Sequence, residues 1–183
     1  MRSCFASALI VALALAAPDA RADTAPQRIL VEAHGGWTVI GAKNPITGFT
    51  PGLSGTYLWS PSDKVRLGLG LDLNVILGGA PRRTGILGGP TARLEVVPWE
   101  TPFALSLAIS AGLGRAPVCT VWPEPICPQF VGSFPAATIS GSYLTESGMF
   151  AGGSFSARWF HTLIGDTASL EPSAFIGVYF ERK

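Results

Sequence analysis

The stretch VRLGLGLDLN, residues 65–74, alternates without interruption between apolar residues and residues that are small or polar. A period of two is typical of a β-strand, because successive side chains point to opposite faces of a sheet. In a soluble protein the leucine face would pack into a core, and Arg66 and Asp72 would face water. In a membrane barrel the leucine face would contact lipid, and these two residues would lie in the lumen. The rest of the sequence decides between the two arrangements.

The first 22 residues have the features of an export signal. Arg2 precedes an apolar run over residues 5–17, and Ala-Arg-Ala at 20–22 has the small-x-small pattern of a cleavage site. The apolar run is shorter than the roughly 20 residues that a transmembrane helix needs. We therefore expect residues 1–22 to be a signal peptide and residues 23–183 to form one exported β-barrel domain.

The mature chain combines few charges with high hydropathy. Charged residues make up 14% of the sequence, against about 25% in an ordinary soluble domain. Removing the signal peptide takes away Arg2, Arg21 and Asp19, which leaves 11 of the 13 basic and 11 of the 12 acidic residues. This balance argues against a nucleic-acid partner. Because no apolar run is long enough for a membrane helix, a closed β-barrel is the remaining way to span a membrane.

Eight segments carry the alternating pattern, each long enough for the roughly 9–11 residues with which a tilted strand crosses a membrane. They are residues 28–40, 47–59, 65–77, 86–98, 103–115, 131–144, 149–163 and 169–180. Short polar turns at 60–64, 98–102 and 145–148 alternate with mostly longer connections at 41–46, 78–85, 116–130 and 165–168. Short turns on one side and longer loops on the other are typical of outer-membrane barrels, with both chain ends on the short-turn side.

The two faces of these segments differ in size and charge. One face carries large apolar side chains, such as Leu105 and Phe155, and the other carries Gly, Ser, Ala and Thr together with most mid-strand charges. The interior of an eight-stranded barrel is only just wide enough for side chains, so the large face would overfill it. We therefore place the small, polar face inside, where buried charges must pair. The expected lumen network consists of Glu32, His34, Arg66, Asp72, Arg93, Glu95, Arg158 and Glu171.

Aromatic residues gather near both ends of the lipid-facing side. Trp and Tyr favour the two membrane–water interfaces, because one part of each side chain is apolar and another is polar. Aromatic residues are also common in soluble strands, but clustering at both ends favours the membrane interpretation. The expected girdle residues are Trp37, Trp59, Trp99, Phe103, Tyr143, Trp159 and Phe180.

The whole mature chain resembles the small eight-stranded outer-membrane barrels of the OmpA-transmembrane and OmpX type. The last strand of that group usually carries a Gly, an aromatic residue three positions later and a terminal Phe. Gly177 and Phe180 match, whereas Glu181, Arg182 and Lys183 follow in place of the terminal aromatic residue. The resemblance implies an all-β, eight-stranded antiparallel up-and-down transmembrane β-barrel in the cell outer membrane. It also implies a monomer in contact with lipid and lipopolysaccharide, without a cofactor.

The connection over residues 116–130 is the candidate binding surface. We expect its Cys119 and Cys127 to form a disulfide, because the protein is exported to an oxidising compartment and no third or fourth metal ligand lies nearby in sequence. Trp122 lies between them, either as an anchor for a partner or packed on the disulfide. Arg82-Arg83, in another connection, is a candidate for contact with lipopolysaccharide phosphates.

Two alternatives stand beside a structural or adhesive barrel with a plugged lumen. A soluble periplasmic barrel of lipocalin type would turn the leucine face inward around a small apolar ligand. A lipid A deacylase needs a His and a Ser two residues apart on the lipid face. His161 is followed two residues later by Leu163, and Thr162 is expected to face the lumen, so the nucleophile is missing. We therefore predict a non-enzymatic protein without a metal ion, whose surface loops bind an unidentified partner.

Overall fold

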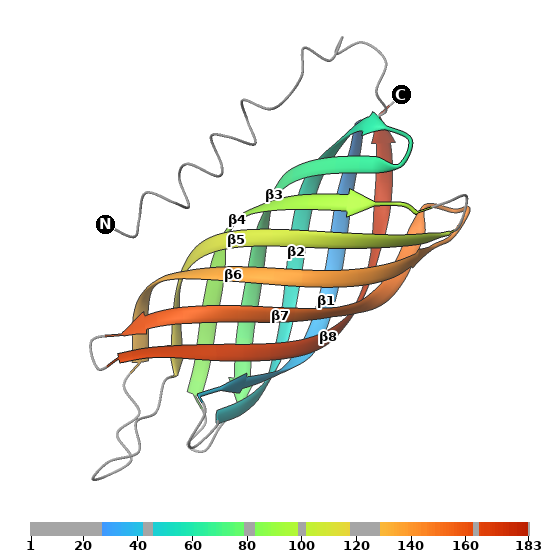
Figure 1. Cartoon of the computed structure of the whole chain (residues 1–183). Coiled ribbons are helices and arrows are strands. Elements are labelled where there is room, and N and C mark those ends of the chain that lie inside the picture. Colours follow the sequence, from blue (N-terminus) through green and yellow to red (C-terminus); the bar gives the residue numbers. More distant parts are fainter. Residues whose placement is uncertain are drawn as a thin grey trace.

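The computed structural model describes residues 27–41, 46–78, 83–98, 102–117, 129–162 and 165–182. Eight strands account for nearly all of these residues (Figure 1): β1 (Gln27–Ile40), β2 (Ile46–Ser62), β3 (Val65–Gly78), β4 (Arg83–Val96), β5 (Phe103–Pro117), β6 (Gln129–Leu144), β7 (Met149–Thr162) and β8 (Gly165–Arg182). Each strand pairs antiparallel with the next, and β8 pairs with β1, so the sheet closes. The expected eight-stranded antiparallel barrel is confirmed. Among the described residues, no helix is long and apolar enough to cross a membrane.

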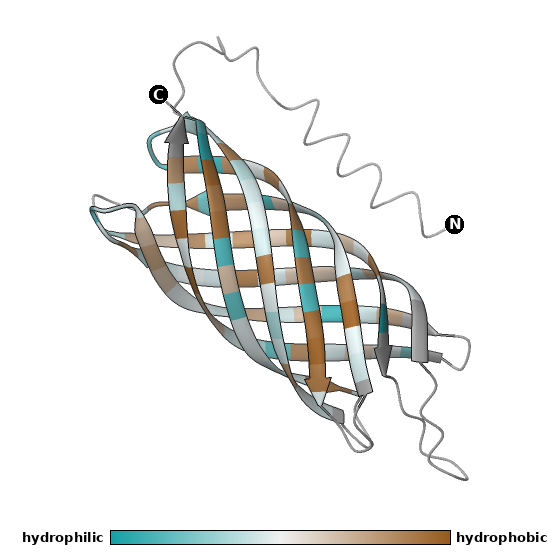
Figure 2. Cartoon of the chain, turned by 180° about the vertical axis from the view of Figure 1, so that it is seen from behind, coloured by the Kyte–Doolittle hydropathy of each residue, from teal (hydrophilic) through white to brown (hydrophobic). Residues whose placement is uncertain are grey.

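Strand β3 shows which face of the wall is outside. Leu69, Leu71 and Leu73 are 56%, 68% and 51% exposed, whereas Arg66 and Asn74 are 8% and 1% exposed. Figure 2 shows the same alternation around the barrel, with apolar and polar residues taking turns along the strands. The leucine face is therefore the outer face. The lipocalin-type alternative, which needs the leucine face inside, does not fit this structure.

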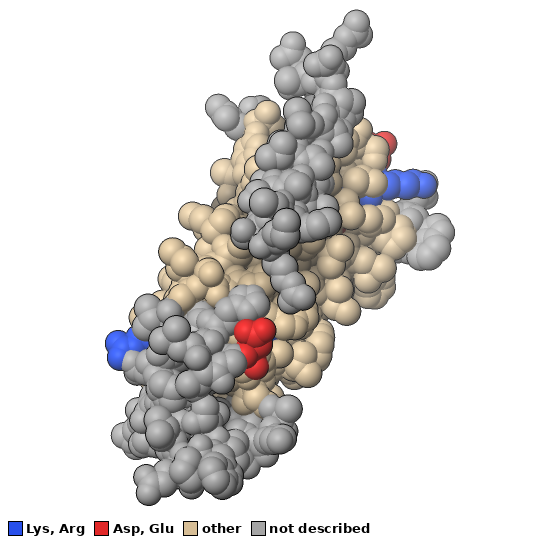
Figure 3. Space-filling view, turned by 60° about the vertical axis from the view of Figure 1, so that its left-hand side comes forward, with Lys and Arg blue, Asp and Glu red and all other residues tan. Residues whose placement is uncertain are grey.

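The outer wall between the two ends of the barrel is mainly apolar. Large exposed side chains on several strands include Trp37, Phe49, Leu113, Ile139 and Ile176. In the view of Figure 3, the visible Lys, Arg, Asp and Glu side chains lie toward the two ends, and the part of the wall that is visible between them carries no charge. Soluble monomers rarely expose so continuous an apolar surface, but the lipid-facing band of a transmembrane barrel has this character.

The connections at the two ends are more alike in length than expected. We call the end with residues 41–45, 79–82, 118–128 and 163–164 the loop end, and the opposite end the turn end. Only the connection over 118–128 is clearly longer than the turns, so the expectation of longer loops is wrong for the connections expected at 41–46 and 78–85. The reason is that the hairpins continue past the expected strand ends; for example, Thr162 pairs with Gly165.

Two apolar clusters occupy the interior, one toward each end. The cluster at the loop end consists of Ile40, Ile76, Leu87, Phe134, Ala136 and Phe160. The cluster at the turn end consists of Leu30, Leu58, Phe150, Phe175 and Tyr179. The expectation of an inner face that is small and polar throughout is therefore wrong at both ends.

Inward-facing glycines make room for these large side chains. Gly112 lies opposite Phe134 in the strand register, and Gly177 lies opposite Phe150. A Cβ atom at Gly112 would lie 2.4 Å from the Phe134 ring, and one at Gly177 would lie 2.2 Å from the Phe150 ring. These glycines do not leave empty space; each lets the large side chain on the neighbouring strand lie across it.

Candidate functional site

The middle of the lumen holds the ionisable residues expected from the sequence. All eight of them lie on the inner face of their strands. Their contacts divide them into a group nearer the turn end and a group nearer the loop end. Each group ties together strands that are distant in sequence, so the network braces the barrel from within.

Glu95 is the centre of the group nearer the turn end, and it is fully buried. Arg66, directly opposite Glu95 in the β3–β4 register, donates from Nη1 to Oε1 at 2.5 Å. The Tyr179 hydroxyl donates to Oε2 at 2.9 Å, and Arg93 Nη2 lies 3.6 Å from Oε2. Arg93 Nη1 also donates to Glu32 at 3.1 Å. Two carboxylates and two guanidinium groups thus form one chain of contacts, which compensates their loss of hydration.

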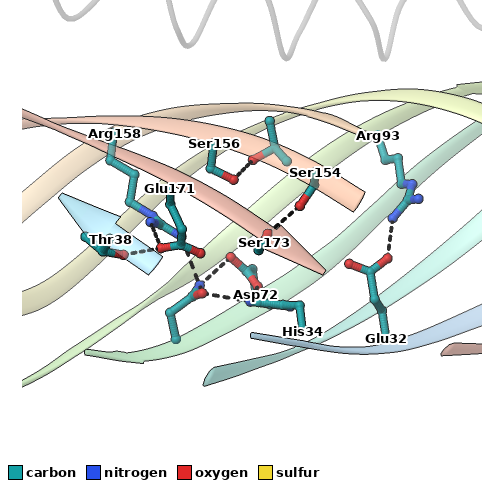
Figure 4. A network of polar contacts seen from close by, with 12 residues as sticks. Glu32, His34, Thr38, Asp72, Arg93, Ser154, Ser156, Arg158, Glu171 and Ser173 are labelled. Atoms are coloured by element: carbon teal, nitrogen blue, oxygen red, sulfur yellow. Dashed lines mark hydrogen bonds and ion pairs between the residues drawn. The ribbon is translucent and has the colours of Figure 1, made fainter. Parts of the chain in front are cut away.

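Glu171 is the centre of the group nearer the loop end, and it is also fully buried. Its Oε2 accepts hydrogen bonds from Arg158 Nη1 at 2.6 Å and from the Thr38 hydroxyl at 2.5 Å. Arg158 Nη2 also donates to Asn74 Oδ1 at 3.3 Å, and Thr38 shares a hydrogen bond with Thr50. Figure 4 shows Arg158, Glu171 and Thr38 converging from β7, β8 and β1.

Asp72 has weaker partners than the other three carboxylates. It accepts a hydrogen bond from Asn74 Nδ2 at 2.6 Å, and its Oδ1 lies 3.9 Å from His34 Nε2. His34 Nε2 in turn donates to Asn74 Oδ1 at 2.8 Å. The network contains four carboxylates and three arginines, and Asp72 is the carboxylate without an arginine partner among the contacts of the described residues.

A small polar cavity separates these charges from a wall of hydroxyl groups. Its volume is about 60 Å³, which is room for a few water molecules. The hydroxyl wall is built from the cross-strand pairs Ser106–Ser140, Thr138–Ser156 and Ser154–Ser173, at 2.5, 2.8 and 2.6 Å. The cavity therefore suits a few ordered waters rather than an apolar ligand.

Four residues of the network were not expected from the sequence. All four lie on the inner face; Tyr179, Asn74 and Thr38 bond directly to charged groups, and Thr50 bonds to Thr38. The alternation of the strands places each of them inside. They were missed because only side chains with a mid-strand charge were considered, although buried charges also need neutral hydrogen-bond partners.

Most of the expected girdle residues lie on the outer face. The exposed members are Trp37, Phe103, Tyr143, Trp159 and Phe180, and Trp59 is half-buried. Trp37 packs against Phe49 near the loop end, with ring centroids 6.2 Å apart. Phe103 packs edge-to-face against Tyr143 near the turn end, at 5.3 Å. Trp99 lies outside the described residues.

Several other expected features also lie outside the described residues. These are the signal peptide, Arg82, Cys119, Trp122, Cys127 and Leu163. Arg83 begins β4, and His161 lies in β7 at the position opposite Asp166. In the described part of the chain, no group of three or more His, Cys, Asp or Glu residues could hold a metal ion.

The barrel is similar to solved structures of several outer-membrane barrels. No protein-family model matches the chain, and no curated protein matches it in sequence. Neisserial surface protein A is 16% identical, with a TM-score of 0.58 over 83% of this chain and 97% of that chain. The N-terminal barrel of OprF from Pseudomonas aeruginosa and the attachment invasion locus protein Ail of Yersinia pestis are 13% and 10% identical. Both have TM-scores of 0.53 over 86% of this chain and 100% of theirs.

This chain has the fold of the small eight-stranded outer-membrane barrels. The closed antiparallel sheet and the apolar outer wall are consistent with that fold. The fold and the outer wall together are those of an outer-membrane protein.

Proposed function

We propose that the protein is a non-enzymatic barrel of the outer membrane, with a closed lumen and a structural or adhesive role. The observation that carries this proposal is the orientation of the wall. The leucine face of β3 is exposed on the outside, while Arg66, Glu95, Arg158 and Glu171 are buried on the inside. Only a protein surrounded by lipid gains from this arrangement.

The closed lumen is supported by the apolar cluster at each end. At the loop end the rings of Phe134 and Phe160 lie 5.7 Å apart, and at the turn end those of Phe150 and Tyr179 lie 4.9 Å apart. An ion on its way through would have to leave water twice at these constrictions. The buried acids and arginines are paired with one another, so their role is to stabilise the barrel and not to bind a substrate.

The adhesive role is assigned to the connections at the loop end. Strand positions are used for lipid contact and for packing inside, so only the connections can vary in chemistry. The connection over residues 116–130 contains Cys119 and Cys127. A disulfide between them would lower the conformational entropy that this connection loses when it binds a partner. We therefore place the main binding surface there.

Anionic groups of lipopolysaccharide are the partner that suits the arginines of the loop end. Arg83 begins β4, Arg82 precedes it in the sequence, and Arg115 is exposed near the loop end of β5. Guanidinium groups bind phosphate and sulfate in a bidentate geometry. The structure of Ail was determined in complex with the heparin analogue sucrose octasulfate, which is an anionic ligand bound by a barrel of the same fold.

Cell fractionation combined with heat-modifiability tests the proposed function. The full chain is expected in the outer-membrane fraction, and its unheated sample should migrate differently from the boiled sample on a detergent gel, because a closed barrel resists unfolding by detergent. Recovery in the soluble periplasm, with a single band position, would contradict the proposal.

A further inference from the structure

The outer wall has a depression over β5, β6 and β7, which we call the wall groove. Its volume is about 450 Å³, and the outward-facing residues that line it are Leu105, Ile139, Gly141, Gly153 and Phe155. Gly141 lies opposite Leu105 in the β5–β6 register and opposite Gly153 in the β6–β7 register. Two neighbouring strands therefore present no side chain at the same level of the wall.

Large apolar side chains stand beside these two glycines. Leu105, Ile139 and Phe155 are 59%, 59% and 44% exposed, so they project from the sheet. Ile139 and Phe155 lie opposite one another, two residues beyond the glycines toward the loop end. The wall groove is thus a hollow with a floor of backbone and sides of apolar side chains, and it lies within the lipid-facing wall.

Packing within the chain does not explain the two glycines. A Cβ atom at Gly141 would lie 3.6 Å from Leu105 Cδ2, and one at Gly153 would lie 3.7 Å from the Ser173 carbonyl oxygen. These are ordinary contacts, in contrast to the 2.4 Å at Gly112. Glycine weakens the interior of a strand, and where it occurs there it often marks a place that a ligand approaches closely. The open floor therefore points to something outside the chain.

The position of the wall groove shows which half of the membrane it faces. On the outer face, the pair Phe103–Tyr143 comes directly before Leu105–Gly141 on the side of the turn end. The Phe103 and Tyr143 rings pack edge-to-face, and such aromatic residues favour the membrane–water interface. The groove therefore begins just inside the turn-end interface, in the adjoining half of the membrane.

We propose that the wall groove binds one acyl chain of a phospholipid from the periplasmic leaflet. Lipid tails are as apolar as the wall, so a preferred site in the membrane depends on closer packing and not on the hydrophobic effect. A chain on the convex wall contacts protein on one side only. A chain in the groove contacts the backbone beneath it and the side chains beside it, which adds dispersion contacts. The proposal rests on the proposed function in placing the turn end in the periplasm.

Two other occupants of the wall groove fit less well. In a two-fold dimer each patch meets its own copy, so the hollow over Gly141 and Gly153 would face an equal hollow and leave a void at a contact that needs close packing. A chain of lipopolysaccharide would come from the opposite leaflet and would have to pass Ile139 and Phe155. A phospholipid chain enters directly from the turn-end interface.

Native mass spectrometry of the folded full chain in detergent tests the proposal, with phosphatidylethanolamine as the probe. Gly153→Leu fills the groove, whereas Gly55→Leu adds the same side chain elsewhere on the outer wall, where a Cβ atom has no neighbour within 4 Å. We expect the wild type and Gly55→Leu to retain one phospholipid equally. Gly153→Leu should bind it about tenfold more weakly, because the packing around one chain is lost. Gly141→Leu fills the groove from the neighbouring strand and should give the same loss.

The proposal is overturned if no phospholipid is retained, or if both groove-filling variants retain it as the wild type does. Retention of purified lipopolysaccharide in place of phospholipid would assign the groove to the other leaflet. A dimer that is lost in Gly153→Leu would identify a second copy as the occupant, and either result would overturn the proposal. The heat-dependent band shift of the same samples reports on the barrel separately. A normal shift without phospholipid binding would refute only the lipid site and leave the proposed function standing.

Discussion

At the scale of single residues, the interior is packed mainly by large side chains that lie across a glycine on the neighbouring strand. Gly112→Ala would place a Cβ atom 2.4 Å from the Phe134 ring and 2.8 Å from the Gly88 carbonyl oxygen. Because the Gly88 oxygen belongs to the backbone, little relaxation is available. We expect the free energy of unfolding in detergent to fall by about 1–3 kcal/mol, as measured by urea titration.

Gly55→Ala is the matched control for this prediction. Gly55 also lies in a strand, but a Cβ atom there would have no atom within 4 Å. Alanine restricts the unfolded chain more than glycine does, so this variant should be as stable as the wild type or slightly more stable. Equal loss of stability in both variants would mean that glycine itself, and not the packing over it, is required.

Arg93 tests the energetic role of the lumen network. It contacts both Glu32 and Glu95, and its removal leaves Glu32 without its ion-pair partner in a buried place. We expect Arg93→Ala to lower the free energy of unfolding by about 3–5 kcal/mol. Arg115→Ala, which removes an exposed arginine, should change it by less than about 0.5 kcal/mol. If Arg93→Ala unfolds like the wild type, the network does not brace the barrel.

Strand alternation was enough to place the eight ionisable residues on the inner face, because a period of two fixes the face of every residue once one is known. Strand alternation could not show which of these residues form ion pairs with one another. That Arg93 bridges Glu32 and Glu95 depends on the register of β1, β4 and their neighbours around a closed sheet, which has no local signature. Tyr179 was placed inside by alternation, but its bond to Glu95 also depends on this register.

At the scale of elements, all eight strands were predictable from the sequence, but the residues at which they begin and end were predicted less accurately. The pattern lost its alternation after residue 115, but β5 continues to Pro117 because β6 pairs with it there. The inner clusters were missed for a related reason. An inward Phe150 looks too large for the lumen until Gly177 is known to lie opposite it, and that pairing joins different strands.

The connection between β5 and β6 should be dispensable for folding. The β5–β6 ladder is complete as far as Pro117–Gln129, so the sheet does not depend on the residues between them. Deleting residues 119–127 should leave the heat-dependent band shift and membrane insertion unchanged, because the packed lumen and outer wall are untouched. Failure of the shortened chain to fold would show that the connection clamps the barrel and is not a free binding surface.

At the scale of the whole molecule, the barrel should conduct poorly. An apolar cluster lies toward each end, and the polar cavity lined by the lumen residues measures about 60 Å³. In planar bilayers the reconstituted protein should give no large, steady single-channel current. A stable current of the size seen with an open pore would contradict the closed lumen, although it would leave the fold itself unaffected.

The orientation of the β3 wall is the central claim, and fluorescence quenching measures it directly. An environment-sensitive fluorophore is attached to Leu71→Cys or Asp72→Cys in the reconstituted barrel, with Ser62→Cys near the turn as an exposed control. Spin-labelled lipid should quench the label at position 71, while the label at 72 should resist lipid and the label at 62 should be quenched by aqueous iodide. Quenching of position 71 by iodide and not by lipid would place the leucine face in water and contradict the account.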